Sequence, residues 1–175
     1  EPAYFDPYGP RYLIMNGMMY AMEPTFPVAQ LYEVGLILTR WRAWALGGLS
    51  YISTDSLREI ARRFWGGEAA ADLTSYDGMA LACKMIQDRQ YTKECLGLCS
   101  WLWTITQLEF TEDHVSDPTL ESRFLSAVTG EEIDEKGLYR KGERVFNLQR
   151  AILVREGHSG REFDKLDERC FTEGL

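Results

Sequence analysis

The sequence lacks the short motifs from which an enzyme's chemistry is most often identified. It contains no CxxC pair, no HExxH, no phosphate-binding glycine-rich loop and no GxSxG nucleophile turn. Histidine is almost absent, since the chain has only His114 and His158, and neither belongs to a Cys/His cluster. A zinc site formed by this chain alone is therefore not expected, and both histidines are predicted to lie on the surface.

Positive charge and long apolar runs are also scarce. The 19 lysines and arginines are outnumbered by 27 aspartates and glutamates, which gives a net charge of −8, and an acidic surface repels phosphate backbones. No apolar run reaches the roughly 20 residues that a membrane helix needs, and the N-terminus has no basic region followed by an apolar run. We therefore predict a soluble, cytoplasmic protein with no nucleic-acid partner and no membrane partner.

Cysteine occurs only four times, as Cys83, Cys95, Cys99 and Cys170. Four cysteines could form disulfides in three ways. A chain of 175 residues, of which 45% are hydrophobic, can however bury a core without disulfides. All four cysteines are therefore predicted to be free thiols in a single domain.

The sequence has no alternating pattern typical of strands and no internal repeat, which predicts an all-α, multihelical domain. Helical spacing of apolar residues, polar caps and glycine stops indicate about five main helices. They are expected at residues 27–46, 54–65, 75–93, 117–129 and 134–156. The last helix has a broad apolar face, and Gln149 in its middle is expected to be a buried amide with satisfied hydrogen bonds.

Two segments differ from these helices in composition. Residues 1–26 hold four of the six prolines and show no hydrophobic periodicity, which predicts an irregular, proline-rich arm lying over a helical domain of residues 27–175. The segment Cys95–Trp103 carries no charge and is apolar on all sides. Such a composition is typical of a segment that is enclosed by protein.

Three short segments carry motifs. Residues 94–99 read ECLGLC, residues 129–133 read TGEEI, and residues 141–157 contain KGERVFNLQR followed by REG. The first resembles the DxxGLC motif of the tungsten-pterin aldehyde ferredoxin oxidoreductases, and the others are similar to that family's C-terminal patterns TGxxx and GERIxNLxRxxxxREG. The resemblance extends from about residue 20 to residue 172.

The resemblance implies the last helical domain of a longer oxidoreductase, which transfers electrons between an aldehyde and ferredoxin. Members of the family hold a bis-pterin tungsten or molybdenum cofactor in an N-terminal β domain. They also hold a 4Fe–4S cluster, with three cysteines from a CxxCxxxC motif in the middle helical domain and the fourth from DxxGLC. The β domain and CxxCxxxC are both absent here, so no cofactor is expected in the chain on its own. The implied partners are the remaining domains and an electron carrier such as ferredoxin.

The same resemblance assigns roles to the residues of the ECLGLC segment. Cys99 would be the fourth cluster ligand, and a soft thiolate suits iron. Glu94 stands where the family has an aspartate that hydrogen-bonds the pterin. Gly97 would let the backbone approach the cofactor closely. Leu98, between Gly97 and Cys99, is also expected to contact the cofactor.

One departure concerns the end of the site where the substrate reacts. Aldehyde-oxidising members carry a histidine in a segment that reads roughly SPRGxxH, whereas the comparable residues 23–31 of this chain contain none. The same family includes the active-site subunits of an ATP-independent benzoyl-CoA reductase, in which tungsten reduces an aromatic acyl thioester. A tungsten-dependent aromatic acyl-CoA reductase subunit is therefore an alternative.

Non-catalytic interpretations remain open for these residues. Cys99 could be an ordinary buried thiol and Glu94 a solvated carboxylate, while Cys83, Cys95 and Cys170 are expected to be packing residues. The chain as a whole could be a helical interaction module in which the Cys99 segment is sealed inside. In a redox-enzyme domain the same segment should be a surface, which the N-terminal arm would cover or through which two chains would pair as a symmetric homodimer.

Overall fold

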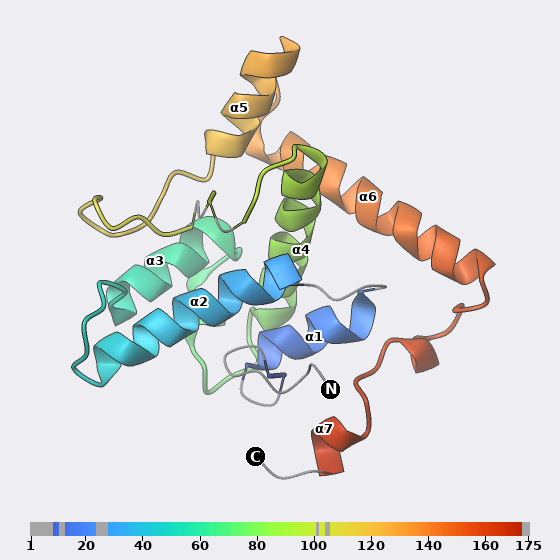
Figure 1. The fold of residues 1–175 in the computed structure, drawn as a ribbon, viewed down its shortest axis with the longest axis horizontal. Helices are drawn as coiled ribbons and strands as arrows, with labels where there is room; N and C mark the ends of the chain where they lie inside the picture. The colour runs from blue at the N-terminus through green and yellow to red at the C-terminus, as the bar shows by residue number, and fades with distance from the viewer. Residues whose placement is uncertain (1–8, 11–12, 24–27, 101, 104–105, 173–175) are drawn as a thin grey trace.

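The computed structural model describes residues 9–10, 13–23, 28–100, 102–103 and 106–172, with the side chains of residues 28–31 and 169 left out. Within these ranges the chain is helical, and the only β pairing is an isolated bridge between Gln107 and Val115. This confirms the predicted all-α class. The α-helices are α1 (Ile14–Met22), α2 (Val28–Ala45), α3 (Thr54–Phe64), α4 (Met79–Cys95), α5 (Leu120–Thr129), α6 (Glu135–Arg155) and α7 (Arg169–Thr172), and two 3-10 turns span Glu68–Ala71 and Arg161–Phe163 (Figure 1).

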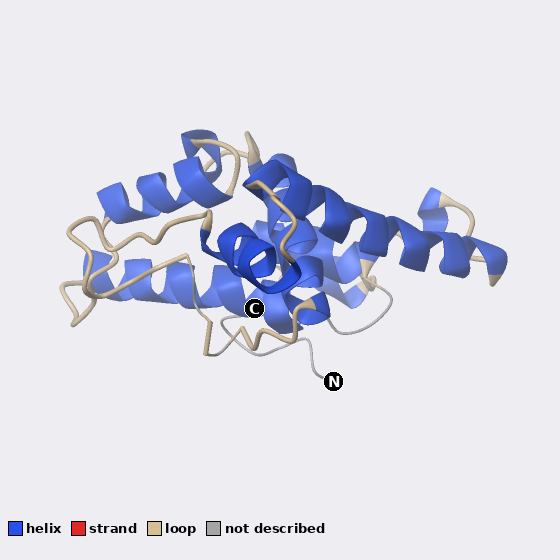
Figure 2. Cartoon of the chain, turned by 90° about the horizontal axis from the view of Figure 1, so that it is seen from above, coloured by secondary structure: helices blue, strands red, loops and turns tan. Residues whose placement is uncertain are grey.

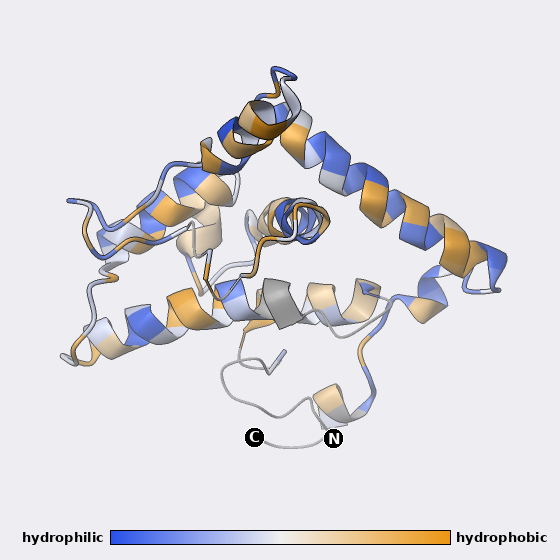
Figure 3. Cartoon of the chain, turned by 45° about the horizontal axis from the view of Figure 1, so that its top comes forward, coloured by the Kyte–Doolittle hydropathy of each residue, from blue (hydrophilic) through white to orange (hydrophobic). Residues whose placement is uncertain are grey.

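Helix α4 lies at the centre of the molecule. Helices α1, α2, α3 and α6 all pack against it, and α5 packs on α6. Figure 2 shows the molecule from above, with loops joining the helices. Figure 3 shows this central helix almost end-on, with the other helices around it. None of the described helices is both long and apolar enough to cross a lipid bilayer. The core consists of buried apolar residues from α1 to α4 and the loops beside them, among them Met15, Met19, Val34, Ile37, Leu57, Ile60, Phe64, Trp65, Ala82 and Ile86.

Capping residues and glycines in the sequence predict several of the helix ends correctly. Asp134 caps α6 as predicted, because its Oδ1 accepts a hydrogen bond from Gly137 N at 2.7 Å. Gly130 ends α5 in a left-handed conformation, also as predicted. The predicted cap of α3 is one residue wrong, since Ser53 and not Thr54 caps the helix, accepting from Ser56 N at 3.0 Å.

The N-terminal arm is not irregular throughout. Residues Ile14–Met22 form α1, although this segment shows no helical periodicity in the sequence. The helix is stabilised by packing on α4, where Cys83 Sγ donates a hydrogen bond to Met15 O at 3.3 Å. The prediction of an irregular arm is therefore wrong for residues 14–22. Residues 1–8, 11–12 and 24–27, which include three of the arm's four prolines and the expected start of α2 at Pro27, lie outside the described residues.

A buried ion pair joins α2 to the centre of α4. Arg89 is 1% exposed and its guanidinium group contacts the carboxylate of Glu33, whose side chain is 6% exposed. The Glu33 carboxylate also accepts hydrogen bonds from Trp65 Nε1 at 3.3 Å and from Gln90 Nε2 at 2.8 Å. Arg89 lies over the ring of Phe64, 5.0 Å from its centroid. Helices α2, α3 and α4 thus meet around one carboxylate.

The other tight contact in the fold is between α4 and α6. A Cβ atom on Gly142 would lie 1.8 Å from Asp88 O and 2.7 Å from Thr92 Oγ1, so only glycine permits this approach. Thr92 Oγ1 lies 3.2 Å from Leu138 O across the same interface. Beyond this crossing α6 leaves the core, and Leu148 and Ile152 are exposed. The predicted apolar face of α6 is therefore buried only in its first half.

Replacing Glu33 with glutamine should destabilise the chain by about 3–5 kcal/mol, because it removes the carboxylate that contacts the buried Arg89 guanidinium group. Burial tends to raise the pKa of Glu33, but the charge and hydrogen bond of Arg89 hold this pKa below its ordinary value. The stability that the pair contributes is therefore present above the ordinary glutamate pKa and is lost as pH falls through the lower pKa of the folded state. Denaturant unfolding followed by circular dichroism should show a steeper acid loss in the wild type than in Glu33→Gln.

The control for this variant is Asp55→Asn, which removes an exposed partner of Arg58 and should cost less than about 1 kcal/mol. Equal effects of the two variants would contradict the role of the buried pair.

Gly142→Ala should destabilise the chain by about 1–3 kcal/mol, since the added methyl group forces α6 away from α4. Gly137→Ala is the comparison on the same helix, because a Cβ there would meet no backbone atom and its nearest neighbour would be the side-chain oxygen of Asp134 at 3.0 Å. That variant should cost less than Gly142→Ala, since only the capping side chain must shift and alanine favours helix. Thermal unfolding of the two variants provides the comparison, and equal melting temperatures would refute this account of the crossing.

Candidate functional site

The ECLGLC segment forms the end of α4 and the turn that follows it. The helix ends at Cys95, and Gly97 adopts a left-handed conformation with φ +69°. Leu98 N donates to Lys93 O at 2.9 Å and Gly97 N donates to Glu94 O at 3.0 Å, the two hydrogen bonds of a Schellman turn. No atom lies within 4 Å of where a Gly97 Cβ would be. The backbone conformation is therefore reason enough for glycine here, independent of any bound group.

The turn brings its thiols to the surface. Cys95 and Cys99 are exposed, and Leu102 is 89% exposed. The expectation that segment Cys95–Trp103 is enclosed by protein is therefore wrong for Cys95, Gly97, Cys99 and Leu102, and Cys95 is not a core residue. The other described residues of the segment are half-buried, and Trp101 lies outside the described part. The described part of the N-terminal arm does not cover Cys99 or Leu102.

Two buried side chains of α4 hold the Cys99 segment from below. Gln90, which is 1% exposed, donates from Nε2 to Glu33 and accepts from Ser100 Oγ at 2.8 Å through its Oε1. Lys93, which is 2% exposed, donates from Nζ to Trp103 O at 3.0 Å. The segment that bears Cys99 is thus fixed to the same carboxylate that binds Arg89.

Lys93 also gives the segment a buried positive charge. Burial lowers the pKa of Lys93 below its ordinary value, while the charges of Glu33, Glu121 and Cys99 act in the opposite direction and that of Arg89 adds to the lowering. Cys99 thus belongs to the electrostatic surroundings of the buried Lys93.

Glu94 belongs to a separate polar cluster between α1, α4 and α6. The Tyr91 hydroxyl donates to the Glu23 carboxylate and also contacts Gln149 Oε1, and Gln87 Nε2 donates to Glu23 Oε1 at 2.5 Å. Burial, and then the charge of Glu23, raise the pKa of Glu94. Burial and the bond to Glu23 likewise raise the pKa of Tyr91. Glu94 itself is exposed at the edge of this cluster and interacts with Glu23 through its charge.

Gln149 is half-buried and hydrogen-bonded to Tyr91, so the expected hydrogen bond is present although the burial is only partial.

The remaining cysteines, Cys83 and Cys170, lie away from the ECLGLC turn in the sequence and are at least half-buried. All four cysteines are free thiols, as predicted. Cys83 is buried, its Sγ bonds to a carbonyl group, and burial raises its pKa to about 12, which confirms a packing role. Cys170 is half-buried. Among the residues that the structure describes, no three His, Cys, Asp or Glu side chains are grouped to hold a metal ion, so this region offers single ligands.

The two histidines lie apart from this site. His158 is exposed and stacks on Phe163, with ring centroids 4.8 Å apart. His114 is half-buried, with its ring 5.1 Å from that of Tyr51 and its Nδ1 3.0 Å from Glu109 O. The predicted surface location is confirmed for His158 and is only partly correct for His114.

Comparison with known protein families decides the relationship. The family model described as aldehyde ferredoxin oxidoreductase, domains 2 and 3, matches residues 6–175. The chain belongs to the aldehyde ferredoxin oxidoreductase family. No solved structure matches the chain. The match includes the ECLGLC turn and the GERV segment of α6, so the expected aldehyde ferredoxin oxidoreductase resemblance is confirmed at the level of the family.

For an aldehyde ferredoxin oxidoreductase domain, the structure adds residues that the sequence pattern did not reveal. Gln90 and Lys93 anchor the Cys99 segment, and Glu23 and Tyr91 surround Glu94. The spacing of Gln90 and Lys93, three residues apart on one side of α4, is a signal that could have indicated the anchors. The Glu23 contact has no local signal, because its partner is 68 residues away.

Gly97→Ala should destabilise the chain by about 1–2 kcal/mol even without cofactor, because a Cβ atom is strained at this left-handed φ. Gly97→Asn should cost less, since asparagine tolerates this conformation better than alanine. Urea unfolding of the 175-residue chain measures both values. An alanine variant as stable as the wild type would show that the turn does not require glycine for its backbone conformation.

Proposed function

We propose that Cys99 supplies one thiolate ligand to a 4Fe–4S cluster and that Glu94 hydrogen-bonds a tungsten- or molybdenum-bis-pterin in a larger oxidoreductase. The observation that carries this proposal is the exposed Cys99 thiol, which follows a Schellman turn and precedes Ser100, whose hydroxyl is bonded to the buried Gln90. An exposed thiol on a fixed backbone is suited to binding iron.

The donor set of this chain fits a shared site better than a self-contained one. A 4Fe–4S cluster needs four ligands, and no group of three or more candidate metal ligands occurs in the described part of the chain. Cys99 would therefore be one ligand of a cluster completed by other parts of the enzyme. When bound, the cluster supplies electron transfer and the metal-pterin supplies the reaction with substrate. The chain's own residues orient the thiolate, place a carboxyl group and provide the Lys93 charge.

The reaction that we propose is electron transfer between an aldehyde or acyl substrate and ferredoxin. A second candidate is the reduction of an aromatic acyl-CoA, and one observation favours it. The segment that begins at Glu23 contains no histidine, and Glu23 itself is bonded to Tyr91 and Gln87. This end of the site therefore offers a carboxyl group and a phenol in place of an imidazole.

A stand-alone interaction module agrees less well with the structure. In such a module the Cys99 segment should be sealed inside, whereas Cys99 and Leu102 are exposed. We propose that the remaining domains of the enzyme cover this surface. Pairing of two chains through the same surface stays a prediction, as does a cytoplasmic location.

The test of the proposed ligand is Cys99→Ala in the complete enzyme, with Cys95→Ala as the matched control. Loss of one thiolate should remove the cluster or leave it labile, so the iron content and the electron paramagnetic resonance signal of the reduced cluster should fall. Cys95 is exposed and has no part in the Schellman hydrogen bonds, so its replacement should leave both measurements unchanged. Equal iron loss in the two variants would show that Cys99 is not the specific ligand.

A further inference from the structure

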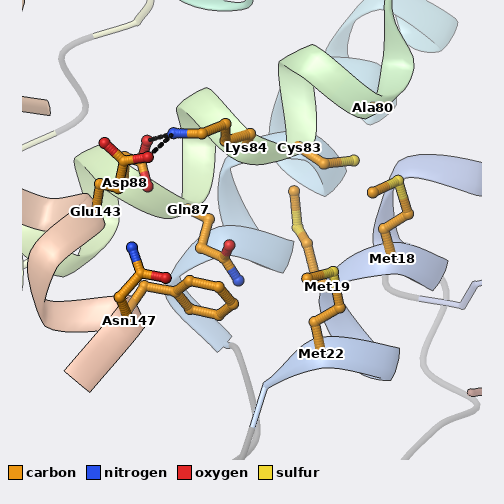
Figure 4. A pocket seen from close by; sticks show the side chains of 11 residues that line it. Met18, Met19, Met22, Ala80, Cys83, Lys84, Gln87, Asp88, Glu143 and Asn147 are labelled. Carbon is orange, nitrogen blue, oxygen red and sulfur yellow. Dashed lines mark hydrogen bonds and ion pairs between the residues drawn. The ribbon is translucent and has the colours of Figure 1, made fainter. Parts of the chain in front are cut away.

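A second site lies on the opposite side of α4 from its contacts with α2 and α3. Helices α1, α4 and α6 enclose a pocket of about 270 Å³ (Figure 4). Its walls come from three methionines of α1, from α4 and from the middle of α6. None of these side chains takes part in the proposed binding of the cluster. The pocket exists because α6 is held close to α4 at Gly142 and then leaves it, while α1 occupies the other side of α4.

The inner walls of the pocket are apolar and rich in sulfur. Met18, Met19 and Met22 lie on one side and Cys83 lies on the α4 side. Phe146 of α6 also lines the pocket. Thioether groups are polarisable and make favourable contacts with aromatic rings, and methionine side chains adapt to the shape of what they contact. A cavity of about 150 Å³ is large enough to hold benzene. The pocket therefore has room for a substituted aromatic ring.

One polar atom in the wall faces the pocket as a hydrogen-bond acceptor. Gln87 is 6% exposed, and its Nε2 is fixed by the bond to Glu23 Oε1 at 2.5 Å. This bond determines which end of the amide is the oxygen, and Gln87 Oε1 accepts no hydrogen bond from the described residues. Figure 4 shows the Gln87 amide directed away from α4 into the pocket. An amide oxygen that faces an otherwise apolar pocket can accept a hydrogen bond from a ligand that carries an O–H or N–H group.

The rim of the pocket selects against anions. Lys84 Nζ contacts Asp88 Oδ2 at 2.5 Å and Glu143 Oε1 at 3.3 Å. Two carboxylates therefore meet one ammonium group, and the local charge is negative. A ligand with a carboxylate or phosphate would be repelled at this rim.

We propose that the pocket between α1, α4 and α6 binds a small uncharged aromatic molecule that donates one hydrogen bond to Gln87 Oε1. The methionines and Phe146 contact the ring, and the acidic rim excludes charged analogues. The pocket consists only of residues of this chain, so the proposal is independent of the cluster and of the pterin. It can be tested on the 175-residue chain alone.

The probes are 4-methylphenol, toluene and 4-methylbenzoate, which share one ring and differ in the donor and the charge. Binding is followed through the methyl signals of methionines labelled with ¹³C. We expect saturable shifts with 4-methylphenol, about threefold to tenfold weaker binding of toluene, which lacks the donor, and still weaker binding of 4-methylbenzoate. Equal affinity for 4-methylphenol and toluene, tighter binding of the benzoate, or shifts that do not saturate would each overturn the proposal.

Two variants with a control distinguish the pocket from the surface. Ala80→Phe fills the pocket from α4 and should abolish the saturable shifts, whereas Ala151→Phe adds the same group to an exposed position of α6 outside the pocket and should not. Gln87→Met should weaken 4-methylphenol and leave toluene unchanged. Toluene binding thus reports whether the pocket of this variant is intact. An equal loss of both ligands would refute the assignment of Gln87 as the acceptor.

Discussion

Glu33 and Arg89 are charged side chains that the fold removes almost completely from water. Each has a high desolvation cost, which is offset mainly by the other, with contributions from the hydrogen bonds of Trp65 and Gln90 to Glu33 and from the ring of Phe64 beneath Arg89. The pair therefore requires α2, α3 and α4 to be in place together. Since Gln90 also accepts from Ser100, the arrangement of the surface that carries Cys99 depends on a contact in the middle of the core.

The features that could be predicted from the sequence are those with local causes. The Asp134 cap and the Gly130 stop depend on hydrogen bonds and backbone conformations within a few residues, and both were predicted correctly. The second half of α4 was not predicted to be buried, because residues 87–93 are mainly polar. Polar residues are buried where partners from other helices satisfy them, and the sequence does not show those partners. Helix α1 was missed for the same reason. It has no helical periodicity of its own and is stabilised by its packing on α4, which the sequence does not show.

In the candidate site, too, the features with local causes could be predicted and those that depend on distant residues could not. The positions of Cys99 and Gly97 in one turn follow from their spacing, and the Schellman hydrogen bonds agree with it. The surroundings of Glu94 come from Glu23 and Gln149, which lie 68 and 58 residues from Tyr91 along the chain. Composition also suggested that the uncharged Cys95–Trp103 segment would be enclosed. It is exposed because the contacts that would cover it are not made by the described part of this chain.

Gln90 has a donor end and an acceptor end, and each end has one partner from a different part of the chain. This couples a contact in the core to the backbone beside Cys99. The donor end is held by Glu33 of α2, and that bond orients the amide so that its oxygen faces Ser100. If Glu33 were replaced, the amide could rotate and Ser100 would lose the partner that fixes it. A substitution on α2 could therefore change the position of a thiol that follows α4, through a single amide group.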